Sequence, residues 1–322
     1  MNSKMTTLEI YALSLIRGIG DRSLMNLVSA KLSIKDIKAL DPDVLGRYVK
    51  GKNKKEAIDF LLNNFDEILI EAQNKISQLE QDGVGLITFW DEKYPRLYRS
   101  IHNPPIFLYV KGNTSLLNQT KSIAIVGTRD CSDQGTKIAR RTAKYFAAQG
   151  YNIVSGLASG IDTAGHKGAL EAKGSTTAVV VDVLNIYPKE NVDLAAQIVK
   201  NNGLLIAESA PGSFVHRGLF VARDRLQSAL CLAVFPIETD IKGGTMHTVG
   251  FAQEQGRLLF CPDLSQIPKR AFMKTSGIKK LIDDGAATLY TMNNYDDVIK
   301  ELEKKERELF SGSTSGVQQR LF

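Results

Sequence analysis

The stretch SIAIVGTRDCSDQG, residues 122–135, is an apolar run that ends in a glycine and is followed by a helical pattern. This order opens a dinucleotide-binding unit, but the G-x-G-x-x-G that holds a pyrophosphate is absent. The stretch VSGLASGIDTAGHKGAL, residues 154–170, repeats the order of apolar run, glycine turn and helix. The two stretches predict an α/β domain and raise the question of what its loops hold.

The alternation of strand and helix continues for more than a hundred residues. Helical patterns over residues 133–148, 162–172 and 191–201 separate strands rich in Val, Ile and Leu, and the strands LCLAVFPI and GRLLFCP follow. Near-continuous apolar strands between helices indicate a mainly parallel sheet that is covered on both faces. The fold class is therefore α/β, with a Rossmann-like doubly wound domain over residues 122–292.

The remaining segments differ in composition. Residues 1–82 carry Leu, Ile, Lys and Glu at helical spacing and predict a small all-α domain. Within it LIRGIGDRSLMNLV fits either a helix-hairpin-helix whose glycines admit a phosphate or a tight interhelical turn. Residues 83–121, rich in proline, predict an extended connector, and residues 293–310 a closing helix. The small polar residues of the tail, 311–322, predict disorder.

Composition excludes several classes of protein. The chain has 322 residues, 43% of them hydrophobic, which is enough for a large core. Its net charge of +6 permits a polyanionic partner and also fits an ordinary solvated surface. Three distant cysteines without metal-ligand spacing indicate reduced thiols. Because no apolar run approaches a membrane span and no signal peptide is visible, we expect a cytoplasmic protein. We expect no metal and no cofactor.

The loops after the strands share a chemistry that suits phosphate. In an open parallel sheet, ligands bind beyond the carboxyl ends of the strands. There, glycines expose backbone amides beside hydroxyls or cations, at helix N-termini that favour negative charge. Tight strand-to-helix turns are the alternative explanation of these glycines. The candidate residues are Gly127, Thr128 and Arg129; Ser155, Gly156, Ser159 and Gly160; and Lys242, Gly243, Gly244 and Thr245.

A further cluster begins the helix FVARDRLQSAL. Arg217, Phe220, Arg223 and Arg225 combine an aromatic ring with guanidinium groups, which suits single-stranded nucleic acid, although Phe220 also fits a core position. A catalytic triad of Ser155, Asp162 and His166 can be imagined. The spacing of Asp162 and His166 indicates a structural hydrogen bond instead, so no catalytic residue is predicted.

These motifs together carry a family resemblance. IAIVGTRDCSDQG, VSGLASGIDTAGHKGAL, IYPKEN, GLLIAES, ARDR and the upstream YPRLYRSIHNPPIFLYVKGN resemble the DNA-processing protein A family, DprA or Smf, over about residues 90–290. The resemblance implies a dimeric Rossmann-like protein that binds single-stranded DNA without sequence preference. It also implies that the protein loads a RecA-type recombinase on DNA in natural transformation, and that the helical domain precedes the Rossmann-like one.

The resemblance places phosphate-binding positions on Arg129, Ser155, Gly156, Arg223, Arg225 and the Gly243-Gly244-Thr245 loop. This sequence departs from the family at three places. Asp224 stands where the family's R-N-R motif has asparagine, KGGTMHT replaces a serine-glycine loop, and Asp182-Val183 replaces a glycine-rich turn. Many family members end in a winged helix, whereas after about residue 290 we expect only one helix and a tail in this sequence. It is identified as a divergent member.

Two other functions remain open. A nucleotide-binding or nucleotide-hydrolysing protein shares the scaffold, but IKGGTMHT lacks the proline and the acidic residue of the related phosphoribohydrolases. A role in antiphage defence uses the same DNA binding. Finally, the last five residues resemble the Q-x-x-L-F peptide that docks on the replication sliding clamp, which makes Gln318, Leu321 and Phe322 candidate partner-binding residues.

Overall fold

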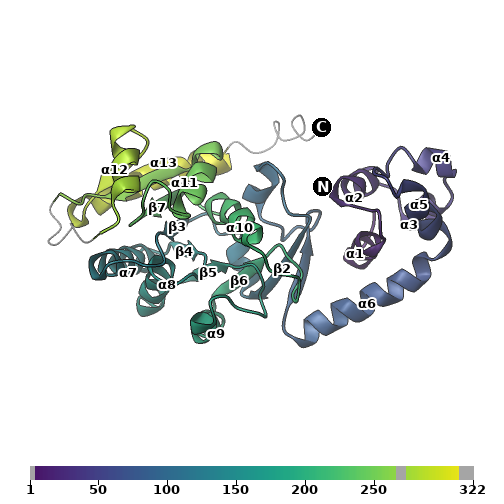
Figure 1. Ribbon diagram of the computed structural model, residues 1–322, viewed down its shortest axis with the longest axis horizontal. Helices are drawn as coiled ribbons and strands as arrows, with labels where there is room; N and C mark the ends of the chain where they lie inside the picture. The colour runs from purple at the N-terminus through teal and green to yellow at the C-terminus, as the bar shows by residue number, and fades with distance from the viewer. Residues whose placement is uncertain (1–3, 266–272, 312–322) are drawn as a thin grey trace. The chain divides into compact units, whose positions relative to one another are not determined.

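The structure is a computed structural model that describes residues 4–265 and 273–311 (Figure 1). The clamp-type residues Gln318, Leu321 and Phe322 lie outside the described residues, as does most of the predicted tail. No helix in the described ranges combines the length and the apolar content that a bilayer crossing requires.

The chain forms two compact units. The first comprises Met1–Tyr94 with Pro105–Tyr109, and the second comprises Pro95–Pro104 with Val110–Phe322. The connector predicted over residues 83–121 is therefore shared between the units. It contains two strands and two short 3-10 helices: β1 (Gly85–Thr88), η1 (Arg96–Ser100), β2 (Phe107–Gly112) and η2 (Thr114–Asn118).

The first unit is mainly helical. Its first helix begins where Thr6 and Glu9 form a capping box, in which each side chain binds the other residue's backbone amide. The helices are α1 (Thr7–Leu15), α2 (Asp21–Ser29), α3 (Ile34–Lys38), α4 (Pro42–Leu45), α5 (Lys54–Asn63) and α6 (Phe65–Gln81).

The turn between α1 and α2 contains the glycines that we singled out in the sequence. Gly18 has φ +99°, and a Cβ there would lie 3.1 Å from the Cβ of Ala57 on α5. A side chain at this position would therefore be strained by the backbone conformation and crowded against the neighbouring helix. The glycine lets the turn pack closely against α5.

The second unit contains the predicted Rossmann-like sheet, and the expected fold class is confirmed. Its strand order is β2-β6-β5-β4-β3-β7-β8-β9, and the pairs from β6 to β9 are parallel. The strands are β3 (Ser122–Val126), β4 (Asn152–Ser155), β5 (Thr176–Val179), β6 (Leu204–Ala207), β7 (Ala233–Pro236), β8 (Leu258–Pro262) and β9 (Thr288–Tyr290).

Helices cover both faces of this sheet. In Figure 1, α7, α8 and α9 lie along one face, and α10 and α11 lie along the other. The helices are α7 (Asp133–Ala148), α8 (Ile161–Glu171), α9 (Val192–Lys200), α10 (Arg217–Ala229), α11 (Thr245–Glu254), α12 (Ser276–Asp283) and α13 (Tyr295–Ser311), with short 3-10 turns η3 (Lys189–Asn191) and η5 (Met292–Asn294). Because both faces are covered, all residues of β3, β4 and β7 are buried.

An aromatic cluster fixes the predicted closing helix. Tyr295 at the start of α13 packs 5.3 Å from the ring of Phe146 on α7, and Phe146 packs 5.3 Å from Phe235 on β7, between ring centroids. Tilted and edge-on contacts of this kind stabilise buried aromatic pairs beyond their area. The segment after Pro262, which looked irregular in the sequence, thus adds β9 to the sheet and packs α13 on its core.

Candidate nucleic-acid interface

A pocket of about 750 Å³ lies beyond the carboxyl ends of β3 and β7. Residues after β3 and β7, the start of α8, and α10 and α11 line it. From β3 the strands β4, β5 and β6 follow one another toward one edge of the sheet, whereas β7 and β8 lie on the other side of β3. The strand order therefore reverses between β3 and β7, which is the switch point of the doubly wound sheet. Ligands of such sheets bind at this place, and the volume is typical of small-ligand sites.

Close glycine contacts shape the loops around the pocket. A Cβ on Gly127 would overlap the side chain of Ile161, and a Cβ on Gly160 would overlap the backbone carbonyls of Thr128 and Arg129. Gly160 also has φ +76°. The loop after β3 and the loop before α8 therefore pack together without side chains between them. This packing presents Thr128 and Arg129 at the pocket.

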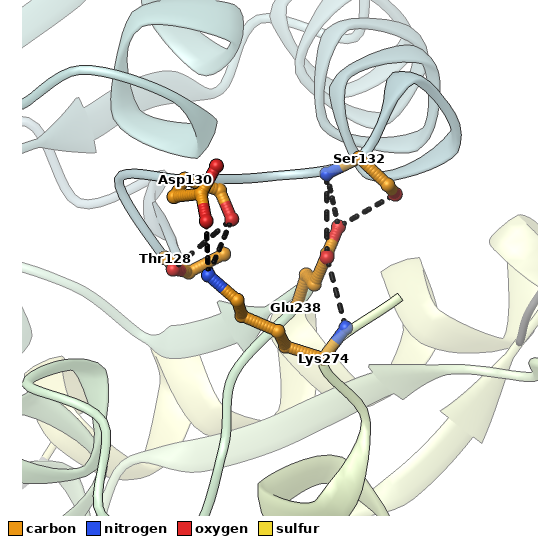
Figure 2. Close-up of polar contacts among 5 residues, drawn as sticks. All are labelled: Thr128, Asp130, Ser132, Glu238 and Lys274. Atoms are coloured by element: carbon orange, nitrogen blue, oxygen red, sulfur yellow. Dashed lines mark hydrogen bonds and ion pairs between the residues drawn. The ribbon is translucent and has the colours of Figure 1, made fainter. Parts of the chain in front are cut away.

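Glu238, which follows β7, holds the loop after β3 (Figure 2). Its carboxylate accepts hydrogen bonds from Ser132 Oγ at 2.8 Å, from the Ser132 amide at 3.1 Å and from the Lys274 amide at 2.9 Å. Its backbone carbonyl accepts one from the Thr128 amide at 2.8 Å. Ser132 in turn caps α7 by accepting from the Gly135 amide. One buried glutamate therefore fixes both ends of the loop.

Lys274 also binds the loop after β3, through Asp130. Its Nζ lies 2.6 Å from Asp130 Oδ2 and 3.0 Å from the Asp130 carbonyl oxygen. The hydrogen bond from Lys274 and its charge lower the pKa of the exposed Asp130 carboxyl. The pair orders the loop, and the charge of Lys274 is balanced by Asp130.

Arg223 lies inside the pocket and not at its rim. The residue is 8% exposed, and a Cβ on Gly156 would overlap its guanidinium. Its charge faces the buried Asp162, which accepts from the Gly156 amide at 3.0 Å, and its Nη1 lies 3.6 Å from Asp224 Oδ1. Burial raises the pKa of Asp162, and the charge of Arg223 opposes that shift. Within residues 4–265 and 273–311, no partner binds Arg223 Nε.

Asp224 adds a second carboxyl group to the interior. Burial raises its pKa to about 6. The charge of Arg223 lowers this pKa, and the charge of Asp162 raises it further. Its Oδ1 accepts a hydrogen bond from Gln227 Nε2 at 3.0 Å. Gln227 is 2% exposed, and its Oε1 has no hydrogen-bond partner among the residues that the structure describes.

The Arg225 side chain does not lie at the pocket that contains Arg223. Its guanidinium pairs with both carboxylate oxygens of Glu208, at 2.8 and 2.7 Å, and donates to the Asn103 carbonyl at 3.0 Å. It lines a second pocket of about 540 Å³ and not the first. The two arginines of the ARDR motif are therefore not brought together, and the charge of Arg225 is balanced by Glu208.

The exposed cations lie at the rim of the first pocket. The Arg129 side chain is exposed, and its Cζ lies 5.8 Å from the centroid of the half-buried Phe220 ring. Arg217 starts α10 and is exposed at the same pocket, and the exposed Lys242 precedes its Gly243 wall. In the described part of the chain, none of the ion pairs includes Arg129, Arg217 or Lys242.

Other predicted site residues are turned inward or toward a neighbour. Ser155 is fully buried and donates to the Ile125 carbonyl at 2.6 Å. Ser159 donates to Glu190 Oε1 at 2.8 Å. Gly243, Gly244 and Thr245 line the pocket, with Thr245 as the first residue of α11. Gly156 contributes its amide to Asp162 and the space that Arg223 fills.

The imagined triad does not assemble. His166 Nδ1 lies 2.7 Å from Thr176 Oγ1, and Asp162 binds backbone amides. The Ser155 hydroxyl is used by a backbone carbonyl. Burial lowers the pKa of His166 to about 3, so the ring is neutral at physiological pH. These groups therefore have structural roles.

Sequence reasoning missed four residues that build the site: Glu238, Gln227, Asp162 as the partner of Arg223, and Lys274. Glu238 directly follows a buried strand, and this placement is a signal that could have found it. Gln227 follows Arg223 by four residues, so both lie on one helical face. Lys274 carried no signal, because it is distant in sequence and comes from outside the strand-helix repeat.

A pocket that contains charged side chains at the switch point of a doubly wound sheet, with an exposed arginine beside an aromatic ring, is the candidate binding site of a Rossmann-like protein. The model of the family DNA recombination-mediator protein A matches residues 85–303, and the chain belongs to this family, known as DprA or Smf. DNA processing protein DprA of Bacillus subtilis is 31% identical over 247 residues, which cover 76% of this chain and 80% of that protein.

Solved structures agree with this membership. DNA processing protein A of Streptococcus pneumoniae matches with a TM-score of 0.70 and 28% identity, over 90% of this chain and 96% of that one. A structure that concerns the single-stranded DNA binding mode of DNA processing protein A from Helicobacter pylori matches with a TM-score of 0.59 and 28% identity. It covers 68% of this chain and 96% of that one.

Proposed function

We propose that this chain binds single-stranded DNA at the first pocket, with phosphates on the rim cations Arg129, Arg217 and Lys242. The observation that carries the proposal is that the exposed Arg129 and Arg217 line one pocket together with the half-buried Phe220, whose ring centroid lies 5.8 Å from Arg129 Cζ. Cations that follow a backbone and a ring on which a base stacks are the parts of a single-strand site. The Helicobacter relative, whose structure concerns single-stranded DNA binding, supports the proposal.

Fluorescence anisotropy with a labelled dT oligomer and with a duplex of equal length tests the proposal. We expect the single strand to bind more tightly, because only unstacked bases can reach the Phe220 ring. Preference for the duplex would contradict the proposal. Phe220→Ala separates stacking from packing: loss of binding with an unchanged melting temperature places a base on the ring.

The finer role that we propose is delivery of the bound strand to a RecA-type recombinase by a homodimer. Family membership supports this role. A pull-down with the recombinase, with and without single-stranded DNA, tests the partner, and sedimentation velocity tests the dimer. A monomer at micromolar concentration, or no recombinase capture in either condition, would contradict the role.

We propose that the site acts by binding, without covalent chemistry. The Ser155 hydroxyl donates to the Ile125 carbonyl and His166 Nδ1 lies at Thr176 Oγ1, so neither group is engaged as in a nucleophile-base pair, which supports this proposal. Incubation with nucleoside monophosphates and analysis for free base tests the hydrolytic alternative. Turnover that a pocket variant abolishes would contradict the proposal.

The C-terminal pentapeptide supports a separate proposal, docking on the replication sliding clamp through Gln318, Leu321 and Phe322. The support is sequence alone, since these residues lie outside the described ranges. Deletion of residues 318–322 should abolish clamp binding in a calorimetric titration and leave DNA binding intact. Clamp binding by the truncated chain would contradict docking by this peptide.

A further inference from the structure

The charges of the first pocket are separated between rim and interior. The exposed Arg129 and Arg217 line its rim, and the exposed Lys242 directly precedes the lining residue Gly243. Inside, the single guanidinium of Arg223 faces two carboxyl groups, Asp162 and Asp224. An anion in the interior would meet these carboxylates as well as the arginine, whereas an anion at the rim meets cations. The interior is therefore suited to an uncharged group.

The interior also offers more hydrogen-bond acceptors than its own donors satisfy. Asp224 Oδ1 accepts from Gln227 Nε2, and a carboxylate has capacity for further donors. The Asp224 side chain keeps 16% of its surface exposed, and the residue lines the pocket. Gln227 Oε1 has no partner in the described ranges. A group that fills this space is favoured if it brings N–H donors to Asp224, and acceptors to Arg223, whose Nε is likewise unpartnered.

Among the DNA bases, guanine meets this requirement best. Its N1–H and N2–H donors lie side by side, so a carboxylate can accept both, and its O6 and N7 are the acceptors that arginine binds. Thymine presents one N–H between two carbonyl oxygens, which would face the Asp224 carboxylate with like partial charge. Adenine and cytosine each offer an amino group beside an acceptor. The pocket volume of about 750 Å³ accommodates a purine nucleotide.

We propose that the interior of the first pocket takes a guanine base, and that Asp224 is the residue that selects it. The inference deepens the proposed single-strand function and rests on it: phosphates stay at the rim while one base enters. Because the pKa of Asp224 is about 6, the carboxylate is ionised, and an acceptor only, at pH 7.5.

The test compares labelled 15-mers of thymidine with and without one central guanine, at pH 7.5, on wild-type protein and on Asp224→Asn. The wild type should bind the guanine oligomer about tenfold more tightly, the ratio typical of one bidentate base contact. In Asp224→Asn this ratio should fall below about twofold. The ratio within each variant cancels any change in overall affinity that follows from removing a charge.

A central inosine is the matched control, because it keeps N1–H and O6 but lacks the amino group at position 2. It should lose most of the preference. Equal wild-type affinity for the guanine and thymine oligomers would overturn the proposal, as would a preference that survives Asp224→Asn. The wild-type comparison stands even if the variant does not fold.

Free guanine nucleotide carries the same base and is the other source of the ligand. Competition with dGMP distinguishes them: displacement of the guanine oligomer only at a large excess supports the strand as the source. Tight dGMP binding by a protein that does not prefer the guanine oligomer would overturn the proposal. Failure of every oligomer to bind would instead contradict the single-strand function itself, so the two failures are distinguishable.

Discussion

Asp224 occupies a position where a carboxylate destabilises the folded chain. Burial raises its pKa to about 6, well above the usual value of an aspartate, and the charge of Arg223 does not offset the desolvation. Asp162 on α8 adds to the shift, while His247 on α11 and Arg129 in the loop after β3 oppose it. A residue that costs folding energy inside a pocket is a candidate for a role in binding.

The cost can be measured with Asp224→Asn, which keeps the shape and one acceptor. Because the folded-state pKa is raised, the protonated form is favoured by folding, and the stability that this proton contributes is lost as pH rises through about 6. Asp224→Asn should therefore be more stable than the wild type at pH 7.5, by on the order of 1 to 3 kcal/mol. Denaturant titrations should show the difference shrinking between pH 6 and 4. A variant that is less stable at pH 7.5 would contradict this account.

Arg129 is expected to contribute charge without sequence preference. Arg129→Ala should weaken binding of every single-stranded oligomer by about 1 to 3 kcal/mol and make the salt dependence shallower by about 0.7 in log-log slope. Lys200→Ala is the matched control, since Lys200 is exposed at the end of α9 and does not line the pocket. Equal losses in the two variants would indicate a nonspecific effect of net charge.

For single residues, the sequence predicts which side chains suit a phosphate site better than it predicts which charged partners those side chains have. Thr128, Arg129 and the Gly243–Thr245 loop were predicted from their place after strands, and Phe220 from its clustering with arginines at the start of a helix. The structure brings them to one pocket. Arg225 was grouped with Arg223 because the two are close in sequence. Its partner Glu208 lies on another segment, and no sequence pattern reveals that carboxylate.

The loop after β3 illustrates how one element depends on others. Residues 127–132 are short of internal hydrogen bonds, and the buried Glu238 supplies their acceptors. Glu238→Gln removes the charge and one acceptor from Ser132 and Lys274. We expect a loss of about 1 to 3 kcal/mol in stability, together with weaker DNA binding as the loop loses its fixed position. Thermal denaturation and anisotropy measure the two effects.

Glu301→Gln is the control for this prediction, because the substitution removes the same charge from a residue that is exposed on α13. It should change neither quantity appreciably. A Glu238→Gln protein with unchanged stability would contradict the role of this carboxylate in holding the loop.

The strand-helix repeat could be predicted because its signals are local. The strands from β3 to β8 are apolar runs, and the intervening helices have amphipathic spacing. β9 was missed since its three residues include two exposed ones and form a strand only beside β8. Tertiary pairing, which propensity does not report, decides such short elements.

For the whole molecule, function depends on where a modest charge excess is placed. The net charge is +6, but ion pairs neutralise Arg225 and Lys274 near the pockets. Arg129 and Arg217, which line the first pocket and are exposed, are in no ion pair within the described residues. Length and composition could not predict this distribution, because it follows from which side chains the fold brings together.

The salt dependence of single-strand binding tests the central claim most directly. Equilibrium dissociation constants for a dT 15-mer, measured by anisotropy from 50 to 400 mM salt, should give a log-log slope of about −2, since the three rim cations Arg129, Arg217 and Lys242 each release about 0.7 counterion. Duplex of the same length should bind more weakly at every salt concentration. A slope near zero, or tighter binding to the duplex, would contradict a phosphate-binding rim at this pocket.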